Sequence, residues 1–188
     1  RAGYSSPVQI PGTNWAQLTG RGDPSGTLAT KTDGTLWSWG YNIGGNLGHN
    51  NRTHYSSPTQ VGSDTNWGTT SKYQLSGMFY ANFAIKDDGT LWSMGYNNSG
   101  SLGLNNNTPY SSPTQIGSDS TWRTVEAGMI GYMAAGTKTD GTGWTWGANQ
   151  YGTLGQNAGA PAKKSSPTQV PGTTWSRISP GDQWYSVL

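Results

Sequence analysis

Residues 88–103 read DGTLWSMGYNNSGSLG, and near-copies of this stretch occupy residues 33–48 (DGTLWSWGYNIGGNLG) and 140–155 (DGTGWTWGANQYGTLG). The tripeptide Ser-Ser-Pro recurs with the same rhythm and begins at positions 5, 56, 111 and 165. A Trp follows each tripeptide at nearly constant distance, at positions 15, 67, 122 and 175. Self-similarity at a period of 51 to 55 residues indicates a solenoid, a propeller or an array of repeats.

Within one repeat the side chains alternate as a short β-strand requires. In residues 90–95, Trp92 and Met94 fall on one side of an extended chain. The Asp-Gly pair before this run predicts a hairpin with a type I′ turn, which needs positive φ at both central residues. The partner strands are then expected at residues 27–31, 82–86 and 134–138.

Two further strands complete the expected repeat. The Ser-Ser-Pro segment predicts an edge strand, because proline cannot donate a hydrogen bond to a neighbour. Another short strand is expected to begin at each Trp that follows. The Asn- and Gly-rich stretch between them suits tight turns with left-handed backbone, and its single Leu is expected to plug the core.

The chain therefore predicts an all-β fold with four short strands per repeat, which matches a β-propeller blade. All 188 residues form one propeller segment of about three and a half blades. The repeats are expected at residues 15–66, 67–121 and 122–174, with a partial repeat at 175–188 and the tail of a preceding repeat at 1–14. Other subunits or further repeats are expected to complete the ring.

The strongest repeat positions are expected to be structural. They are Asp33, Gly34, Trp37, Trp39, Gly40, Asn42, Leu47, Gly48, Asp88, Gly89, Trp92, Gly95, Asn97, Leu102, Gly103, Asp140, Gly141, Trp144, Trp146, Gly147, Asn149, Leu154 and Gly155. The tryptophans of the set are expected to fill the packing between blades.

Composition argues against several classes of function. Charged residues make up 11% of the chain and the net charge is +2, with basic residues scattered apart from Lys163-Lys164, so no nucleic acid is expected as a partner. No apolar run approaches the ~20 residues of a membrane-spanning helix, so no membrane insertion is expected. The chain has no Cys, and Glu126 is its only Glu.

The same inventory predicts no catalytic site, no metal and no cofactor. Asp33, Asp88 and Asp140 lie in expected hairpin turns, where Asp is favoured for backbone reasons. The two histidines, His49 and His54, fall in one loop, so neither a metal site nor a catalytic triad is clearly encoded.

The candidate binding residues lie in the stretches that vary most between repeats. Loops held by a rigid scaffold are where binding residues tend to be found. No repeat rule requires an aromatic residue at Phe79, Tyr80, Tyr132 or Trp184. Arg21 and Asp23 belong to an Arg-Gly-Asp tripeptide, a sequence that integrins bind.

The repeat resembles the regulator of chromosome condensation repeat family. The pattern Asp-Gly-x-Leu-Trp-x-Trp-Gly-x-Asn-x-x-Gly-x-Leu-Gly, followed by Ser-Pro-x-x-Val/Ile, is met by residues 33–61, 88–116 and 140–170, with Gly143 in place of Leu. The resemblance implies a β-propeller, typically of seven blades. Two features depart from it. The family usually carries Gly-x-x-His-Thr-x-Ala before the Asp-Gly, and no His occurs there; and three and a half blades cannot close a seven-bladed ring.

The low-charge, Asn-rich form of the repeat is similar to bacterial and bacteriophage members. It leads to the expectation of a non-enzymatic scaffold for display or attachment, located extracellularly, on a cell surface or in a virion. Its variable loops would bind a protein or a glycan. The alternative is an intracellular protein-interaction propeller of the exchange-factor or chromatin-binding type.

Overall fold

The computed structural model describes residues 6–19, 26–69, 73–128, 132–157 and 162–181, and these form three antiparallel four-stranded sheets. The first sheet contains β1 (Trp15–Leu18), β2 (Thr27–Lys31), β3 (Leu36–Gly40) and β4 (Tyr55–Gln60). The second contains β5 (Leu75–Met78), β6 (Ala81–Ile85), β7 (Leu91–Gly95) and β8 (Tyr110–Gln115). The third contains β9 (Trp122–Ala127), β10 (Met133–Lys138), β11 (Gly143–Gly147) and β12 (Lys164–Val170).

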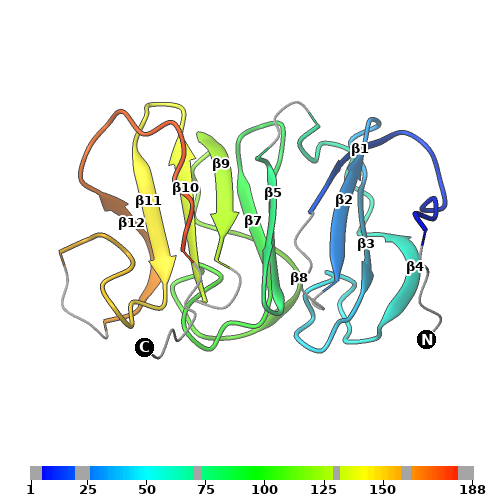
Figure 1. Ribbon diagram of the computed structural model, residues 1–188, viewed down its shortest axis with the longest axis horizontal. Helices are drawn as coiled ribbons and strands as arrows, with labels where there is room; N and C mark the ends of the chain where they lie inside the picture. Colours follow the sequence, from blue (N-terminus) through cyan, green and yellow to red (C-terminus); the bar gives the residue numbers. More distant parts are fainter. Residues whose placement is uncertain (1–5, 20–25, 70–72, 129–131, 158–161, 182–188) are drawn as a thin grey trace.

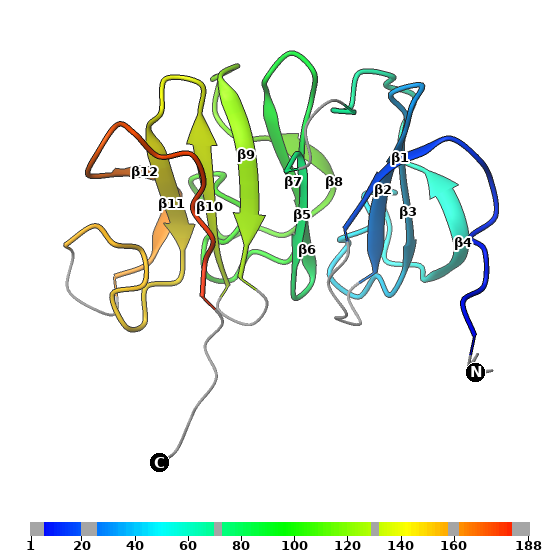
Figure 2. The ribbon, with the colours of Figure 1, turned by 45° about the horizontal axis from the view of Figure 1, so that its top comes forward.

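Each sheet is one blade whose strands follow one another in chain order, so each hydrogen-bonds to its sequence neighbours. The three blades stand side by side, as Figures 1 and 2 show. The Asp-Gly hairpins lie at the end of the blades that is uppermost in Figure 1, which we call the turn face. The long loops between the third and fourth strands of each blade lie at the opposite end, the loop face. The predicted all-β propeller architecture is confirmed.

The predicted strand positions agree closely with the blades. The Ser-Ser-Pro segments form β4, β8 and β12, each at the edge of its sheet, as expected. A strand begins at Trp15 and at Trp122. The expectation is wrong for Trp67, which makes only an isolated bridge to Lys86 before β5 begins at Leu75, and for Trp175, where the described residues form no strand.

The backbone after Trp67 is instead bound to the preceding blade. Gly68 O accepts hydrogen bonds from Gln17 Nε2 at 3.3 Å and from Thr30 Oγ1 at 3.3 Å. Because these bonds lie between blades, the sequence of a single repeat does not reveal them.

The hairpin turns differ from the predicted type I′ geometry. Only the glycine of each pair has a positive φ, 78° at Gly34, 80° at Gly89 and 82° at Gly141. Gly89 N donates to Lys86 O, and Lys86 N donates to Thr90 O, which is the pattern of a longer turn with a glycine bulge. The Asp88 carboxylate accepts from the backbone N–H of Thr90, and this bond favours the observed turn.

The hydrophobic core lies between the blades. Leu28, Leu36 and Val61 of the first blade pack with Trp67 and Met94 of the second. A second cluster joins the next pair of blades, where Phe83 meets Trp146 with ring centroids 6.0 Å apart. Burial between blades explains why each sheet needs apolar residues on both of its faces.

The expected leucine plug is confirmed in all three blades. Leu47, Leu102 and Leu154 are buried. In the first blade, Asn42 holds the loop around the plug: its Oδ1 accepts from Leu47 N, and its Nδ2 donates to Asn51 O and Thr53 O. The equivalent bond from the Leu backbone to the Asn side chain recurs in the other two blades.

Candidate functional site

On the turn face, each Asp-Gly hairpin carries a hydrogen-bonded chain of three side chains. In the second blade, Trp92 Nε1 donates to Thr90 Oγ1 at 2.9 Å, and Thr90 Oγ1 donates to Asp88 Oδ1 at 2.6 Å. The threonine hydrogen bonds lower the pKa of the aspartate carboxyl below its ordinary value. The same chain and the same direction of pKa shift occur at Asp33 and Asp140.

Beside each hairpin, a lysine ammonium lies against two tryptophan rings. Lys86 Nζ is 4.7 Å from the centroid of Trp67 and 4.4 Å from that of Trp92, and it also pairs with Asp64 at 2.6 Å. Lys138 repeats this arrangement with Trp122, Trp144 and Asp119. Lys31 lies over Trp15 and Trp37. All three lysines thus contact tryptophans at the turn face, and two of them, Lys86 and Lys138, also form ion pairs with aspartates.

The tryptophans predicted to fill the space between blades divide into two groups. Trp146 is fully buried, and its Nε1 donates to Ser101 O of the preceding blade at 2.9 Å. The other four, Trp37, Trp39, Trp92 and Trp144, are only half-buried. The positions of Trp37, Trp92 and Trp144 are therefore explained by their contacts with lysines as much as by packing between blades.

Glu126 is buried and engaged. Its carboxylate receives two hydrogen bonds from Arg177, one of them from Nη2 at 3.0 Å, and these bonds raise the pKa of Arg177. Arg177 also lies 4.6 Å from the ring centroid of Tyr73. Glu126 thus connects β9 to the segment after β12 and carries no sign of a role as a general acid or base.

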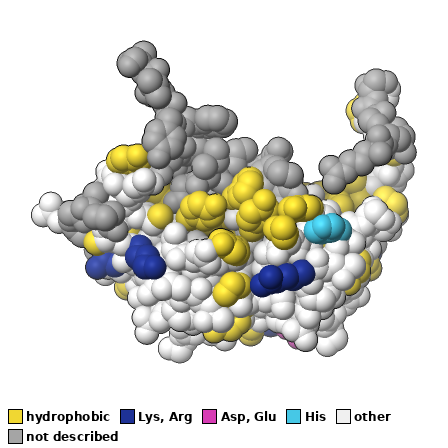
Figure 3. All heavy atoms as spheres, turned by 90° about the horizontal axis from the view of Figure 1, so that it is seen from below, with side chains coloured by type: hydrophobic (Ala, Val, Ile, Leu, Met, Phe, Trp, Pro, Cys, Tyr) yellow, Lys and Arg dark blue, Asp and Glu magenta, His cyan; other side chains and the backbone are white. Residues whose placement is uncertain are grey.

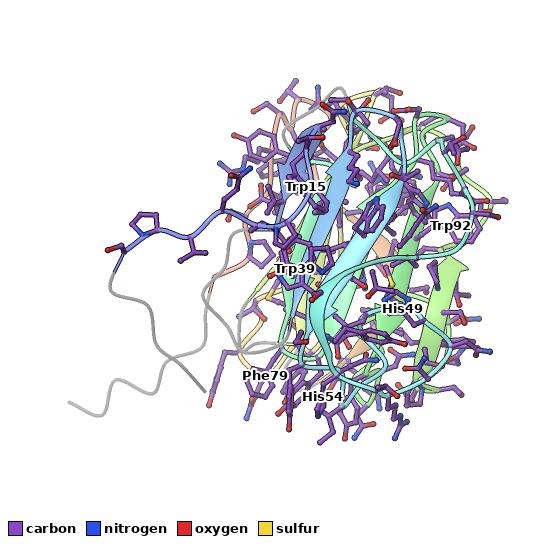
Figure 4. The ribbon with its side chains drawn as sticks, turned by 90° about the vertical axis from the view of Figure 1, so that its right-hand side faces the viewer. Trp15, Trp39, His49, His54, Phe79 and Trp92 are labelled. Atoms are coloured by element: carbon purple, nitrogen blue, oxygen red, sulfur yellow. The ribbon has the colours of Figure 1, made fainter. Side chains whose placement is uncertain are left out.

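The loop face carries a cluster of aromatic rings, which we call the aromatic cluster: Tyr41, His54, Phe79, Tyr80 and Tyr96. The His54 ring stacks on Tyr41 at 4.5 Å with an interplanar angle of 17°, and Tyr41 lies 6.1 Å from Tyr80. Tyr80 also contacts Phe79 at 4.2 Å and Tyr96 at 6.4 Å. Figure 4 shows Phe79 and His54 together at the lower end of the molecule, away from Trp15.

The cluster is partly open to solvent. His54 is exposed, and the other four residues are intermediate in exposure. Aromatic rings that are half-buried on a rigid support offer large contact area at low cost in side-chain entropy, and tyrosines are frequent among residues that dominate binding energy. Figure 3 shows hydrophobic side chains gathered in a band across this face, with a histidine beside it.

Tyr80 and Tyr132 occupy a backbone conformation that bulky residues rarely adopt. Their φ values are 63° and 47°. In this conformation each tyrosine carbonyl forms an inter-strand hydrogen bond. Tyr80 O accepts from Tyr96 N at 2.8 Å, and Tyr132 O accepts from Ala148 N at 3.0 Å. A tyrosine at such a position costs of order 1 kcal/mol, so its presence is a hint of function.

Some predicted site residues come together and others do not. Phe79 and Tyr80 lie in the aromatic cluster, and Tyr132 holds the corresponding place one blade further along. Trp184, Arg21 and Asp23 lie outside the described residues.

Sequence reasoning missed Tyr41, Tyr96 and His54. A signal for two of them existed, because Tyr precedes the signature Asn in the first two repeats but is Ala148 in the third.

The described part of the chain contains neither a cluster of metal-binding side chains nor a membrane-spanning helix. Among those residues, no group of three or more His, Asp or Glu side chains is arranged to hold a metal ion. No helix long and apolar enough to cross a bilayer occurs among them.

The blades, their lysine–tryptophan contacts and their hairpins define a β-propeller repeat protein. The sequence pattern called "Regulator of chromosome condensation (RCC1) repeat" matches residues 33–75, 88–129 and 140–184. The chain belongs to the RCC1 repeat family.

Its relatives include much longer proteins. Human Protein RCC2 is 30% identical over 141 residues, which span 70% of this chain and 25% of RCC2. The human E3 ubiquitin-protein ligase HERC2 is 30% identical over 130 residues, 69% of this chain and 3% of the ligase. Among solved structures, Prp20p from Saccharomyces cerevisiae has a TM-score of 0.68 at 18% identity over 80% of this chain and 37% of Prp20p, a likeness of fold.

These comparisons correct two expectations. The bacterial or bacteriophage subtype is not supported, because the relatives RCC2 and HERC2 are human proteins. The predicted extracellular, cell-surface or virion location is wrong: the relatives are human proteins of the RCC1 repeat family and include a ubiquitin-protein ligase, whose activity lies inside cells. The polar, Asn-rich surface that suggested a phage origin reflects the loops' turn chemistry, in which Asn50, Asn105 and Asn157 all take positive φ.

Proposed function

We propose that this chain is a non-enzymatic protein-interaction scaffold that works inside the cell and binds a protein partner through the aromatic cluster. It corresponds to the exchange-factor or chromatin-binding type of RCC1 propeller. Further repeats or other subunits complete the ring, and the blades described here hold the cluster in a fixed place.

The observation that carries the proposal is the convergence of five aromatic residues from two blades on one face. Tyr41 and His54 come from the first blade, whereas Phe79, Tyr80 and Tyr96 come from the second. No packing rule of the repeat requires this, because the third blade has Ala148 where the others have tyrosine. The proposal that the partner is a protein is supported by Prp20p, a structural neighbour that binds Gsp1p and histones.

Crosslinking from inside the cluster tests the proposal. A photoreactive phenylalanine analogue at position 79 is expected to form adducts with a protein when the chain is irradiated in a cell extract. Tyr96→Ala should reduce this adduct roughly tenfold or more, because removing an aromatic anchor costs about 2 kcal/mol or more. The same analogue at position 175, a tryptophan 39% exposed outside the cluster, is the matched control.

Three outcomes would contradict the proposal. One is equal adduct yield from positions 79 and 175. Another is a yield from position 79 that Tyr96→Ala leaves unchanged. The third is a glycan array that the chain binds through Tyr96 while no protein adduct forms.

A further inference from the structure

Charge is divided unequally between the two faces of the described blades. Every aspartate that the structure describes lies in a connection at the turn face: Asp33, Asp64, Asp87, Asp88, Asp119 and Asp140. Three lysines lie beside them: Lys31 and Lys138 end β2 and β10, and Lys86 directly follows β6. The hairpin threonines lower the pKa of Asp33, Asp88 and Asp140, so these carboxyls are ionised at neutral pH.

The loop face has the opposite character. Its described loops contain Arg52, Lys163 and Lys164 and no carboxylate. Arg52 and Lys163 are exposed, and Lys164 is half-buried at the start of β12. In Figure 3, Lys and Arg side chains form two separate groups on this face beside the hydrophobic band, and acidic side chains are almost absent from it.

The basic residues on this face are not part of the repeat. Arg52 stands two residues before His54, whose ring stacks on Tyr41. The same two positions in the second blade are Asn107 and Pro109, and that loop has the same fold: Thr53 N and Thr108 N each donate to an Asn side chain at 2.8 Å. The blade therefore does not need a cation here, whereas the His54 imidazole has a structural contact, because its Nδ1 accepts from Asn42 N at 2.9 Å.

We propose that the loop face recognises an acidic protein segment. Apolar or aromatic side chains of the segment rest on the aromatic cluster, and its carboxylates face Arg52 on one side and Lys163-Lys164 on the other. This rests on the proposed function and specifies the chemistry of the partner. A basic segment is not favoured, because the described residues of the face include no carboxylate to pair with it. Nucleic acid is not favoured either, because its tight binding usually involves more phosphate contacts than three cations supply.

Four probes separate the possibilities in a fluorescence anisotropy titration. The first is a labelled twelve-residue peptide that alternates Glu with Tyr and Leu; the second replaces each Glu by Gln, the third replaces it by Lys, and the fourth is single-stranded DNA of twelve nucleotides. The acidic peptide is expected to bind at least fivefold more tightly than the Gln peptide at 50 mM salt. The difference should shrink towards unity at 500 mM salt, because exposed charges are screened.

Exchanging residues between the two equivalent loops supplies matched variants. Arg52→Asn installs the second blade's own residue and should weaken binding of the acidic peptide about two- to fivefold, the range expected for an exposed ion pair. Asn107→Arg should strengthen it by a similar factor. Ser118→Asp on the turn face changes net charge by the same amount as Arg52→Asn and should leave binding unchanged, because Ser118 lies in an exposed turn at the other end.

The outcomes distinguish this inference from the proposed function. Tyr96→Ala should weaken binding of the acidic and Gln peptides alike, whereas Arg52→Asn should affect only the acidic one. Equal binding of the two peptides, tighter binding of the DNA, or an equal effect of Ser118→Asp would overturn the acidic-segment inference while the aromatic cluster could still bind protein. Binding that depends on Arg52 but not on Tyr96 would overturn the proposed role of the cluster.

Discussion

At the scale of the residue, position 49 shows how one side chain replaces another in the repeat. Ser38 Oγ donates to Leu47 O at 2.7 Å, so the contact of 2.9 Å between Ser38 Oγ and His49 Nε2 requires His49 to donate. In the third blade Gln156 Nε2 donates to Thr145 Oγ1 at 2.7 Å in the same way. A neutral imidazole with its proton on Nε2 therefore satisfies the loop.

This arrangement predicts a pH dependence of stability. Burial lowers the pKa of His49 below its ordinary value of 6.5, so the unfolded chain binds a proton more readily than the folded one. The free energy of unfolding should be highest above pH 6.5 and should fall as the pH drops through and below that value. Urea titrations between pH 5 and pH 8 measure it, with His49→Gln as the control that copies Gln156.

The control variant should remove that part of the pH dependence while keeping the donated hydrogen bond. A histidine contribution that persists in His49→Gln would have to come from His54, and the assignment to His49 would be wrong.

At the scale of the element, the Asp-Gly hairpin holds the next blade as well as its own. Gly34 O, Gly89 O and Gly141 O accept from the backbone N–H of Trp67, Trp122 and Trp175, at 2.9 to 3.0 Å. Each glycine is packed closely there, since a Cβ added at Gly89 would lie 2.1 Å from Ser120 O. The hairpin is thus a joint between repeats, which explains why the Asp-Gly pair recurs so faithfully.

Two glycine substitutions separate this close approach from backbone strain. Gly89→Ala should destabilise the chain by roughly 3 kcal/mol or more, because it combines positive φ with a clash against backbone. Gly117→Ala, at φ 62° with open space around it, should cost only about 1 to 2 kcal/mol. Urea midpoints of both variants test the difference, and equal losses would mean that the clash relaxes without cost.

At the scale of the whole molecule, stability lies between blades, so equivalent residues differ in importance according to their neighbours. Trp146 is buried against Phe83 and bonded to Ser101 of the preceding blade. Trp39 has the same place in its own blade but is half-buried and contacts Trp15 at 5.7 Å. Repeat proteins gain much of their stability from such nearest-neighbour interfaces.

We predict that truncating Trp146 and truncating Trp39 to alanine lower the free energy of unfolding by different amounts. Trp146→Ala should cost about 3 to 5 kcal/mol of unfolding free energy, because it removes a large side chain from a filled interface. Trp39→Ala should cost less than half as much, since its ring has fewer partners to lose. Equal losses in urea denaturation would show that packing within a blade matters as much as packing between blades.

Much of the fold could be predicted from the sequence because it depends on local rules. Alternation around Trp92 and Met94 marks a strand, and Pro58 and Pro113 mark edge strands. The prediction of a type I′ turn was wrong, because hydrogen bonds from Thr90 to the Asp88 side chain favour a different turn. The prediction that the first strand of the second blade starts at Trp67 was wrong, because the backbone at Gly68 is bound to the first blade.

The sequence by itself determined that this protein is a row of four-stranded blades, since strand alternation and turn chemistry act over a few residues. Only the tertiary structure decided that Tyr41 and His54 meet Phe79, Tyr80 and Tyr96, because these rings belong to different repeats and converge when the blades pack. It also decided that the described aspartates gather at the turn face, while Arg52, Lys163 and Lys164 lie at the loop face. Both results follow from the antiparallel strands, which carry alternate connections to opposite faces.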